Sequence, residues 1–203
     1  MAAPQSQRSE SRADVAICVG GGNDPLAEYA AALTLCTENG KSVANFICND
    51  TLACFPGTIH HGATLHPDKW VYWKSIRERN GYPMPERLWA HRSYDDFTNW
   101  TKDWQGSSGL FLVKIARELG YTHIVLCGIP MTEDGLHFER RQHWTSAPGF
   151  RKGWARVQGA LRPFVRSMSG WTAEHFGRPD SEWLASDIPD PFPMKTNHSG
   201  VSA

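Results

Sequence analysis

Short apolar runs and longer amphipathic segments alternate along most of the chain. Residues 14–19 form a mostly apolar run that ends at three glycines, and residues 26–37 beyond it are rich in alanine and leucine. An apolar run that stops at glycines is typical of a buried parallel strand, and Pro25 suits the first turn of a helix. The opening of the chain therefore predicts a strand, a tight turn and a helix.

The same alternation recurs along the chain, and the strongest strand signal is the run at residues 122–127, which ends at Gly128. Strands that alternate with helices predict an α/β domain with a mostly parallel sheet. Residues 100–106 and 131–148 have no such pattern and predict irregular loops. The other expected strands are 42–48, 62–65, 87–91 and 164–168, and the other expected helices are 69–79, 107–119 and 149–161.

Composition agrees with one folded domain. The chain has 203 residues, of which 40% are hydrophobic and 21% charged, which is enough apolar surface for a core. We expect the domain to span residues 13–184, between a flexible tail at 1–12 and a proline-rich tail at 185–203. The 21 basic residues equal the 21 acidic residues, which argues against non-specific coating of DNA.

The sequence also indicates a cellular compartment. No apolar run approaches the roughly 20 residues that a membrane span needs, and the polar N-terminus lacks the apolar centre of a secretory signal. The cysteines number five, form no Cys-x-x-Cys pair and include three that end apolar runs, Cys18, Cys48 and Cys127. These features predict reduced, mostly buried thiols in a cytoplasmic protein.

The loops that follow the predicted strands are the candidate site, because open α/β sheets bind ligands outside the carboxyl ends of their strands. Glycines let a backbone approach a ligand closely, and a following helix offers unpaired N–H groups and a positive dipole end. The first turn lacks the G-x-G-x-x-G pattern, so a nucleotide-contacting turn and a plain tight turn are both open. The candidate binding residues in these loops are Gly20, Gly21, Gly22, Asn23, Asn49, Gly128 and Thr132.

A second small-residue segment stands at the start of a predicted helix. Ser107, Ser108 and Gly109 supply two hydroxyls and several unpaired amides there, which suits a phosphate or a ribose. The alternative is an ordinary serine N-cap. The two segments together favour a ligand.

Histidines and arginines gather in the loop at residues 131–148. His137 and His143 are candidate general bases, because imidazole titrates near neutral pH, although a solvent-exposed loop histidine is the alternative for each. Arg140 and Arg141 would counter a diphosphate unless they are only solvated. The histidines of the chain have neither H-E-x-x-H nor H-x-H spacing, so we expect no metal site.

Four short sequence segments, spread over much of the chain, are informative when they are taken together. They are residues 19–26 (VGGGNDPL), 46–49 (FICN), 107–109 (SSG) and 119–129 (LGYTHIVLCGI). Together they resemble the glycine-rich turn, the Phe-Arg-Cys-Asn segment, the Ser-Ser-Gly helix and the following strand of the bacterial lipooligosaccharide sialyltransferases. The related 6-hydroxymethylpterin diphosphokinase-like family, domain of unknown function 115, has the same turn. The likeness covers about residues 14–170.

The resemblance implies a single Rossmann-like domain, with helices on both faces of the sheet, that binds a nucleotide or a nucleotide-sugar. It implies that Gly21, Gly22, Asn23 and Asn49 contact the nucleotide and that Ser107, Ser108 and Gly109 lie at its base, ribose or phosphate. It also implies that His143 stands near the base histidine of the sialyltransferases. Short Rossmann proteins in tailed-phage genomes look similar too, which suggests a phage-encoded member.

Three functions remain open at this stage. The first is a sialyltransferase-like glycosyltransferase that moves a sugar from a nucleotide donor to an unknown hydroxyl acceptor and requires no cofactor. The second is a pyrophosphokinase-like enzyme that uses ATP and Mg²⁺, because Asp50, Asp68 and Glu133 lie near strand ends. The third is a non-catalytic nucleotide-binding or assembly protein, because Pro130 replaces an acidic residue of the family and its phosphate-contacting tyrosines are missing. Each of the three functions is compatible with a homo-oligomer.

Overall fold

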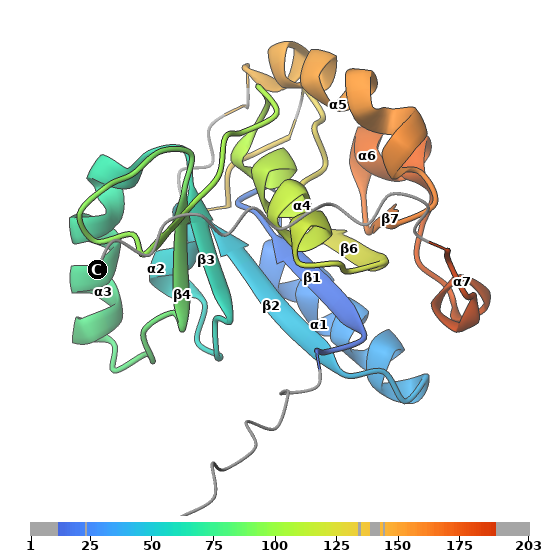
Figure 1. Ribbon diagram of the computed structural model, residues 1–203, viewed down its shortest axis with the longest axis horizontal. Helices are drawn as coiled ribbons and strands as arrows, with labels where there is room; N and C mark the ends of the chain where they lie inside the picture. Colours follow the sequence, from blue (N-terminus) through green and yellow to red (C-terminus); the bar gives the residue numbers. More distant parts are fainter. Residues whose placement is uncertain (1–11, 23, 134, 139–142, 144, 190–203) are drawn as a thin grey trace, which may run out of the picture.

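The computed structural model describes residues 12–22, 24–133, 135–138, 143 and 145–189. Across these residues a single sheet holds seven strands in the order β5-β4-β3-β2-β1-β6-β7 (Figure 1). Every neighbouring pair is parallel. The strands are β1 (Val15–Val19), β2 (Val43–Cys48), β3 (His61–Thr64), β4 (Arg87–Ala90), β5 (Asn99–Trp100), β6 (His123–Cys127) and β7 (Val165–Ser167).

Helices cover both faces of the sheet, which confirms the predicted α/β class. Figure 1 shows α4 on one face and α1 on the other. Helices α5 and α6 pack with α4, whereas α2, α3 and α7 pack with α1. The helices are α1 (Pro25–Glu38), α2 (Thr51–Cys54), α3 (Trp70–Arg79), α4 (Ser108–Glu118), α5 (Ala147–Leu161), α6 (Gly170–Phe176) and α7 (Ser181–Ala185), and the 3-10 helix η1 (Pro67–Lys69) precedes α3.

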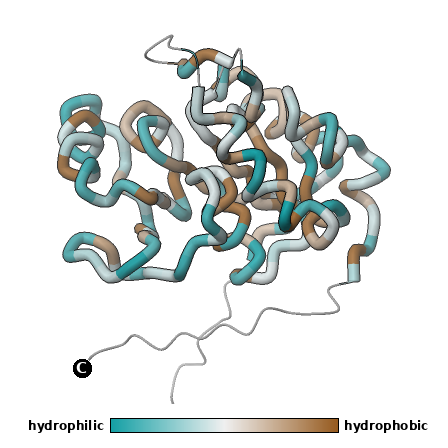
Figure 2. The backbone as a smooth tube through the Cα atoms, turned by 90° about the horizontal axis from the view of Figure 1, so that it is seen from above, coloured by the Kyte–Doolittle hydropathy of each residue, from teal (hydrophilic) through white to brown (hydrophobic). Residues whose placement is uncertain are grey.

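The core consists of two apolar layers, one on each face of the sheet. Along β1, Ala16 and Cys18 pack in the layer of α4, whereas Val15, Ile17 and Val19 pack in the layer of α1. Because both faces of the central strands are buried, β1 and β6 are continuous apolar runs rather than alternating ones. Figure 2 shows these apolar stretches running through the interior of the molecule. Within the described ranges, no helix has both the length and the apolar character to span a bilayer.

The direction of the chain across the sheet reverses between β1 and β6. From β1 the strands proceed in sequence to β5 at one edge, and β6 and β7 then extend the sheet on the other side of β1. At such a reversal the loops after the two adjacent strands diverge and leave a crevice at the carboxyl ends. The fold therefore places the candidate site above β1 and β6.

Some elements differ from the sequence expectation. Helices α2, α6 and α7 and strand β5 were not predicted, and helix α5 begins two residues before its expected start at 149. The predicted tails at 1–12 and 185–203 lie mostly outside the described residues, so these boundaries remain predictions.

Candidate functional site

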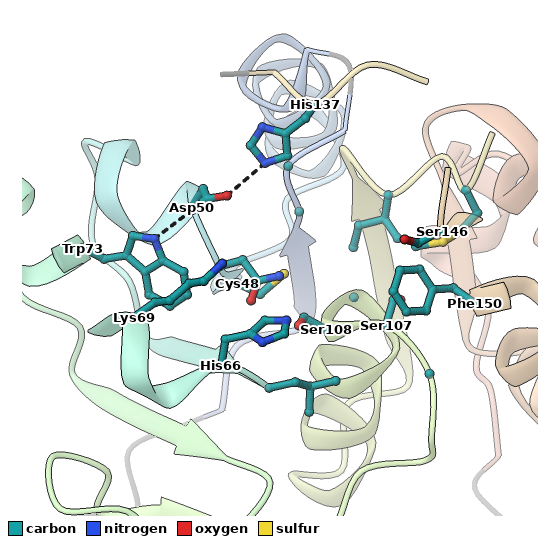
Figure 3. Close-up of a pocket in the computed structure, with 18 residues that line it drawn as sticks. Cys48, Asp50, His66, Lys69, Trp73, Ser107, Ser108, His137, Ser146 and Phe150 are labelled. Atoms are coloured by element: carbon teal, nitrogen blue, oxygen red, sulfur yellow. Dashed lines mark hydrogen bonds and ion pairs between the residues drawn. The ribbon is translucent and has the colours of Figure 1, made fainter. Parts of the chain in front are cut away.

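A cavity of about 470 Å³ opens at the carboxyl end of the sheet, where the loops that follow β1 and β6 diverge. This volume lies within the range of small-molecule sites. Its wall consists of the loops after β1, β2, β3 and β6 together with the first turn of α4 and the start of α5 (Figure 3). The topological reversal and the cavity therefore coincide.

The structure brings together the two segments that the sequence singled out. The predicted site residues on the cavity wall are Gly20, Gly21, Asn49, Ser107, Ser108, Gly109 and His137. The structure does not place Gly22, Gly128, Thr132 or His143 on this wall. Asn23, Arg140 and Arg141 lie outside the described residues.

In the glycine turn after β1, the amides of Gly20 and Gly22 donate to carbonyls at the end of β6 and in the loop that follows it. The N–H of Gly20 donates to the carbonyl of Cys127 at 2.9 Å, and that of Gly22 donates to the carbonyl of Gly128 at 2.8 Å. A Cβ on Gly20 would lie 2.7 Å from Cγ1 of Ile129, so the turn needs glycine to pack against the loop after β6. These two amides are therefore used within the protein, and a binding role for Gly20, Gly21 and Gly22 remains a prediction.

The N-terminus of α1 is also occupied by the protein itself. Pro25 has no N–H, and the Asp24 carboxylate caps the helix by accepting from the amide of Ala27 at 3.2 Å. The Glu28 carboxylate accepts from the amide of Gly128 at 2.6 Å, so this amide is also used within the protein. Two carboxylates at this helix start disfavour an anionic ligand there.

The N-terminus of α4 presents backbone amides to the cavity. Ser107 is the N-cap, and its hydroxyl accepts from the amide of Leu110 at 3.3 Å and from the indole of Trp154 at 3.1 Å. The amides of Ser108 and Gly109 belong to the first turn, where no helix carbonyl can accept from them, and both residues line the cavity. The N-cap interpretation of Ser107 is thus confirmed, and the same helix start places unpaired amides and a positive dipole end at the cavity.

An aspartate and a histidine lie in contact beside the glycine turn that follows β1. One Asp50 oxygen accepts from the indole N–H of Trp73 at 2.9 Å, and the other lies 3.1 Å from Nε2 of His137 (Figure 3). His137 lies over Gly21, where a Cβ would come within 2.9 Å of Nε2. The structure therefore fixes an imidazole at the cavity through a carboxylate that is itself held by a buried indole.

The link between Asp50 and Trp73 was not apparent in the sequence. The two residues are separated by 23 positions and meet because α2 packs against α3. Asp50 also stands at the N-cap position of α2 without capping it, so its carboxylate remains available to the two neighbours.

The loops after β2 and β3 are joined at the cavity. The Thr64 hydroxyl donates to the side-chain oxygen of Asn49 at 3.0 Å and accepts from the amide of His66 at 2.8 Å. Asn49 and Met131 have left-handed backbones, with φ of 55° and 51°. Non-glycine residues rarely adopt this conformation, and such strain tends to occur at functional sites.

Two buried titratable residues of the sheet, Cys48 at the cavity and His61 at the start of β3, are unsuited to chemistry at neutral pH. Burial and the neighbouring Asp50 raise the pKa of the Cys48 thiol to about 12, so this cavity residue is not a nucleophilic thiolate. His61 lies within β3, and burial lowers its pKa to about 3. Within the described part of the chain, no group of three or more His, Cys, Asp or Glu side chains could hold a metal ion.

The comparisons with known proteins identify the fold. Neither a protein-family model nor a curated protein matches the chain. Among solved structures, the chain is similar to the sialyltransferase CstII from Campylobacter jejuni in complex with a substrate analogue, cytidine-5'-monophosphate (CMP). The TM-score is 0.57 at 14% identity, and the match covers 87% of this chain and 88% of that chain. The protein therefore has the Rossmann-like α/β fold that the resemblance implied, whereas membership of the diphosphokinase-like family and a phage origin remain predictions.

Proposed function

We propose that the protein is a glycosyltransferase that moves a sugar from a nucleotide donor to a hydroxyl of an acceptor. The observation that carries the proposal is a single cavity that combines the unpaired amides of Ser108 and Gly109 with the Asp50–His137 pair. The likeness of the fold to a sialyltransferase in complex with CMP supports the nucleotide part of the proposal.

The first turn of α4 binds the phosphate of the donor in this proposal. The amides of Ser108 and Gly109 donate to phosphate oxygens, and the dipole of the 11-residue helix stabilises their negative charge. When the bond between the sugar and the phosphate breaks, its electron pair leaves with the nucleotide. The same amides then stabilise the charge that develops on the leaving phosphate.

His137 is the general base in this proposal. In this proposal Nε2 of His137 donates to Asp50, and Nδ1 accepts the proton of the attacking hydroxyl. Asp50 holds the ring and stabilises the imidazolium that forms, and Trp73 holds Asp50. His137 is favoured over His143, which is exposed and lies off the cavity wall.

A thermal-shift panel with CMP, UDP, GDP and ATP, each with and without Mg²⁺, tests the ligand class. We expect at least one nucleotide to stabilise the protein without Mg²⁺, by about 2.7 kcal/mol when it is present at 100-fold its Kd. A shift seen only with ATP and Mg²⁺ would favour the pyrophosphokinase-like alternative. No shift with any of the four would overturn the proposal.

Release of nucleotide from sugar donors tests the chemistry. The His137→Ala variant is expected to bind nucleotide as the parent does and to lose about 10² or more in turnover. His143→Ala is the matched control and is expected to stay within a few-fold of the parent. Undiminished turnover in His137→Ala would contradict the assigned base, and nucleotide binding without turnover of any donor would favour the non-catalytic alternative.

A further inference from the structure

Two nitrogen-bearing side chains enter the cavity from the loop after β3. His66 precedes η1 and Lys69 ends it, and both line the cavity. Figure 3 shows both side chains pointing into it. Neither residue has a role in the phosphate binding or the proton transfer proposed above.

The backbone of this loop is held in place. The amide of His66 donates to the Thr64 hydroxyl at 2.8 Å, and the amide of Lys69 donates to the carbonyl of His66 at 3.0 Å. Pro67 between them is buried. The two side chains therefore project from a defined turn rather than from an irregular loop.

The positive charge of Lys69 is not neutralised from within the described structure. The acidic side chain on the described cavity wall, Asp50, is engaged by Trp73 and His137. Across the described ranges, the ion pairs and hydrogen bonds include none from the side chain of Lys69 or of His66. A cation that faces a cavity without a protein partner attracts an anionic ligand there.

We infer that Lys69 and His66 form a second anion subsite, which takes an anionic group that the donor carries in addition to the phosphate bound at α4. This inference rests on the proposed function. The chemistry fits a compact oxyanion, which is either the β-phosphate of a nucleoside diphosphate or a carboxylate on the transferred sugar. The subsite would select donors with two anionic groups over donors with one phosphate and a neutral sugar.

The test measures the affinities of CMP, CDP and a CMP-linked sialic acid by isothermal titration calorimetry at low ionic strength. The variant is Lys69→Met, which keeps most of the aliphatic stem and removes the charge. The matched control is Lys74→Met, which removes the same charge from an exposed position of α3 off the cavity wall. His66→Gln is a second variant that probes the imidazole separately.

We expect Lys69→Met to weaken the binding of CDP, of the CMP-linked sialic acid or of both by about tenfold and to leave the affinity for CMP unchanged. A selective loss of affinity for CDP assigns the subsite to a β-phosphate, and a selective loss of affinity for the sialic acid conjugate assigns it to a carboxylate. Equal effects on all three ligands, or the same effects in Lys74→Met, would overturn the subsite. If the parent protein binds none of the three ligands but is stabilised by another nucleotide in the thermal-shift panel, the monophosphate and diphosphate of that nucleotide are compared instead. No binding in either experiment means that the proposed function itself fails.

Discussion

Arg77 is a buried cation that joins three segments of the chain. Its side chain is 0% exposed, and its guanidinium donates to the carbonyls of Leu52 at 2.6 Å, Phe55 at 2.8 Å and Pro83 at 3.0 Å. These bonds connect α3 to α2 and to the loops that follow both helices. Because α3 carries Trp73, Arg77 also supports the indole that holds Asp50.

Replacing Arg77 by methionine should destabilise the protein strongly. The change leaves the buried carbonyls of Leu52 and Phe55 and the carbonyl of Pro83 without their donor, which costs about 3–5 kcal/mol in the free energy of unfolding. Urea denaturation measures this loss. Arg79→Met at the exposed end of the same helix is the control and should cost less than about 1 kcal/mol. Similar losses in the two variants would contradict the role assigned to Arg77.

The burial of His61 predicts that the folded protein loses stability on mild acidification. The ring stacks on Phe46 with centroids 4.4 Å apart, and its Nδ1 accepts from the indole of Trp89 at 3.1 Å. Burial lowers its pKa from 6.5 to about 3 in the folded state. The unfolded chain therefore binds a proton first, so the stabilisation is complete above about pH 6.5 and is lost as the pH falls toward 3.

Urea denaturation at pH 7 and pH 5 checks this pH dependence. His61 alone should contribute a loss of about 2 kcal/mol between the two values. His123, whose pKa burial also lowers, acts in the same direction. His61→Gln should be less stable at pH 7 but should lose less on acidification. A parent protein and a variant with the same pH dependence would contradict this account.

At the scale of single elements, the position of α4 depends on α5. Gly153 of α5 packs against the segment that leads into α4, and a Cβ there would lie 2.8 Å from the carbonyl oxygen of Gln105 and 3.1 Å from Cα of Gly106. Gly159 on the same helix is exposed and has nothing within 4 Å of its Cβ position. The two glycines thus differ in packing although both lie within one helix.

Alanine substitutions at these two glycines should have opposite effects. Gly159→Ala should stabilise the protein by about 0.5–1 kcal/mol, because alanine favours helix and meets no neighbour. Gly153→Ala should destabilise it by about 1–3 kcal/mol and weaken nucleotide binding, because it displaces the segment before Ser107. Thermal unfolding and CMP titration measure both effects. Stabilisation by Gly153→Ala would show that α5 does not position α4.

Most of the larger elements could be predicted from the sequence, because their signals are local. Strands β1 and β6 are continuous apolar runs that end at glycine, and the start of α4 has a serine N-cap. Strand β5 and helix α2 were missed, since the two residues of β5 and the four of α2 are too few to show a period. Their conformations depend on the neighbouring sheet and on α3.

At the scale of the whole molecule, the sequence predicted where the site lies better than how it is built. The rule that ligands bind at the carboxyl ends of strands placed Gly21 and Ser108 on one rim, and the cavity confirms this. The acceptors of the Gly20 and Gly22 amides could not be predicted, because they are carbonyls at the end of β6 and in the loop after it, far away in the sequence. The Trp73–Asp50–His137 contacts were equally out of reach, since each depends on packing between distant segments.

The topology also limits where an anion can bind. Two helices begin near the reversal of strand order, but α1 starts with Asp24 and Glu28 whereas α4 starts with serine and glycine. A phosphate is therefore favoured at the start of α4 over the start of α1. The proposed binding mode requires a negative charge from the ligand at the first turn of α4.

Calorimetric titration of CMP into Ser107→Asp and Ser107→Asn tests that claim most directly. Both residues are good N-caps, so both variants should keep α4, and they differ by one negative charge beside the proposed phosphate. We expect the asparagine variant to bind CMP within a few-fold of the parent, whereas the aspartate variant should lose about tenfold or more in CMP affinity at low salt. Equal affinity of the two variants for CMP would contradict a phosphate at α4.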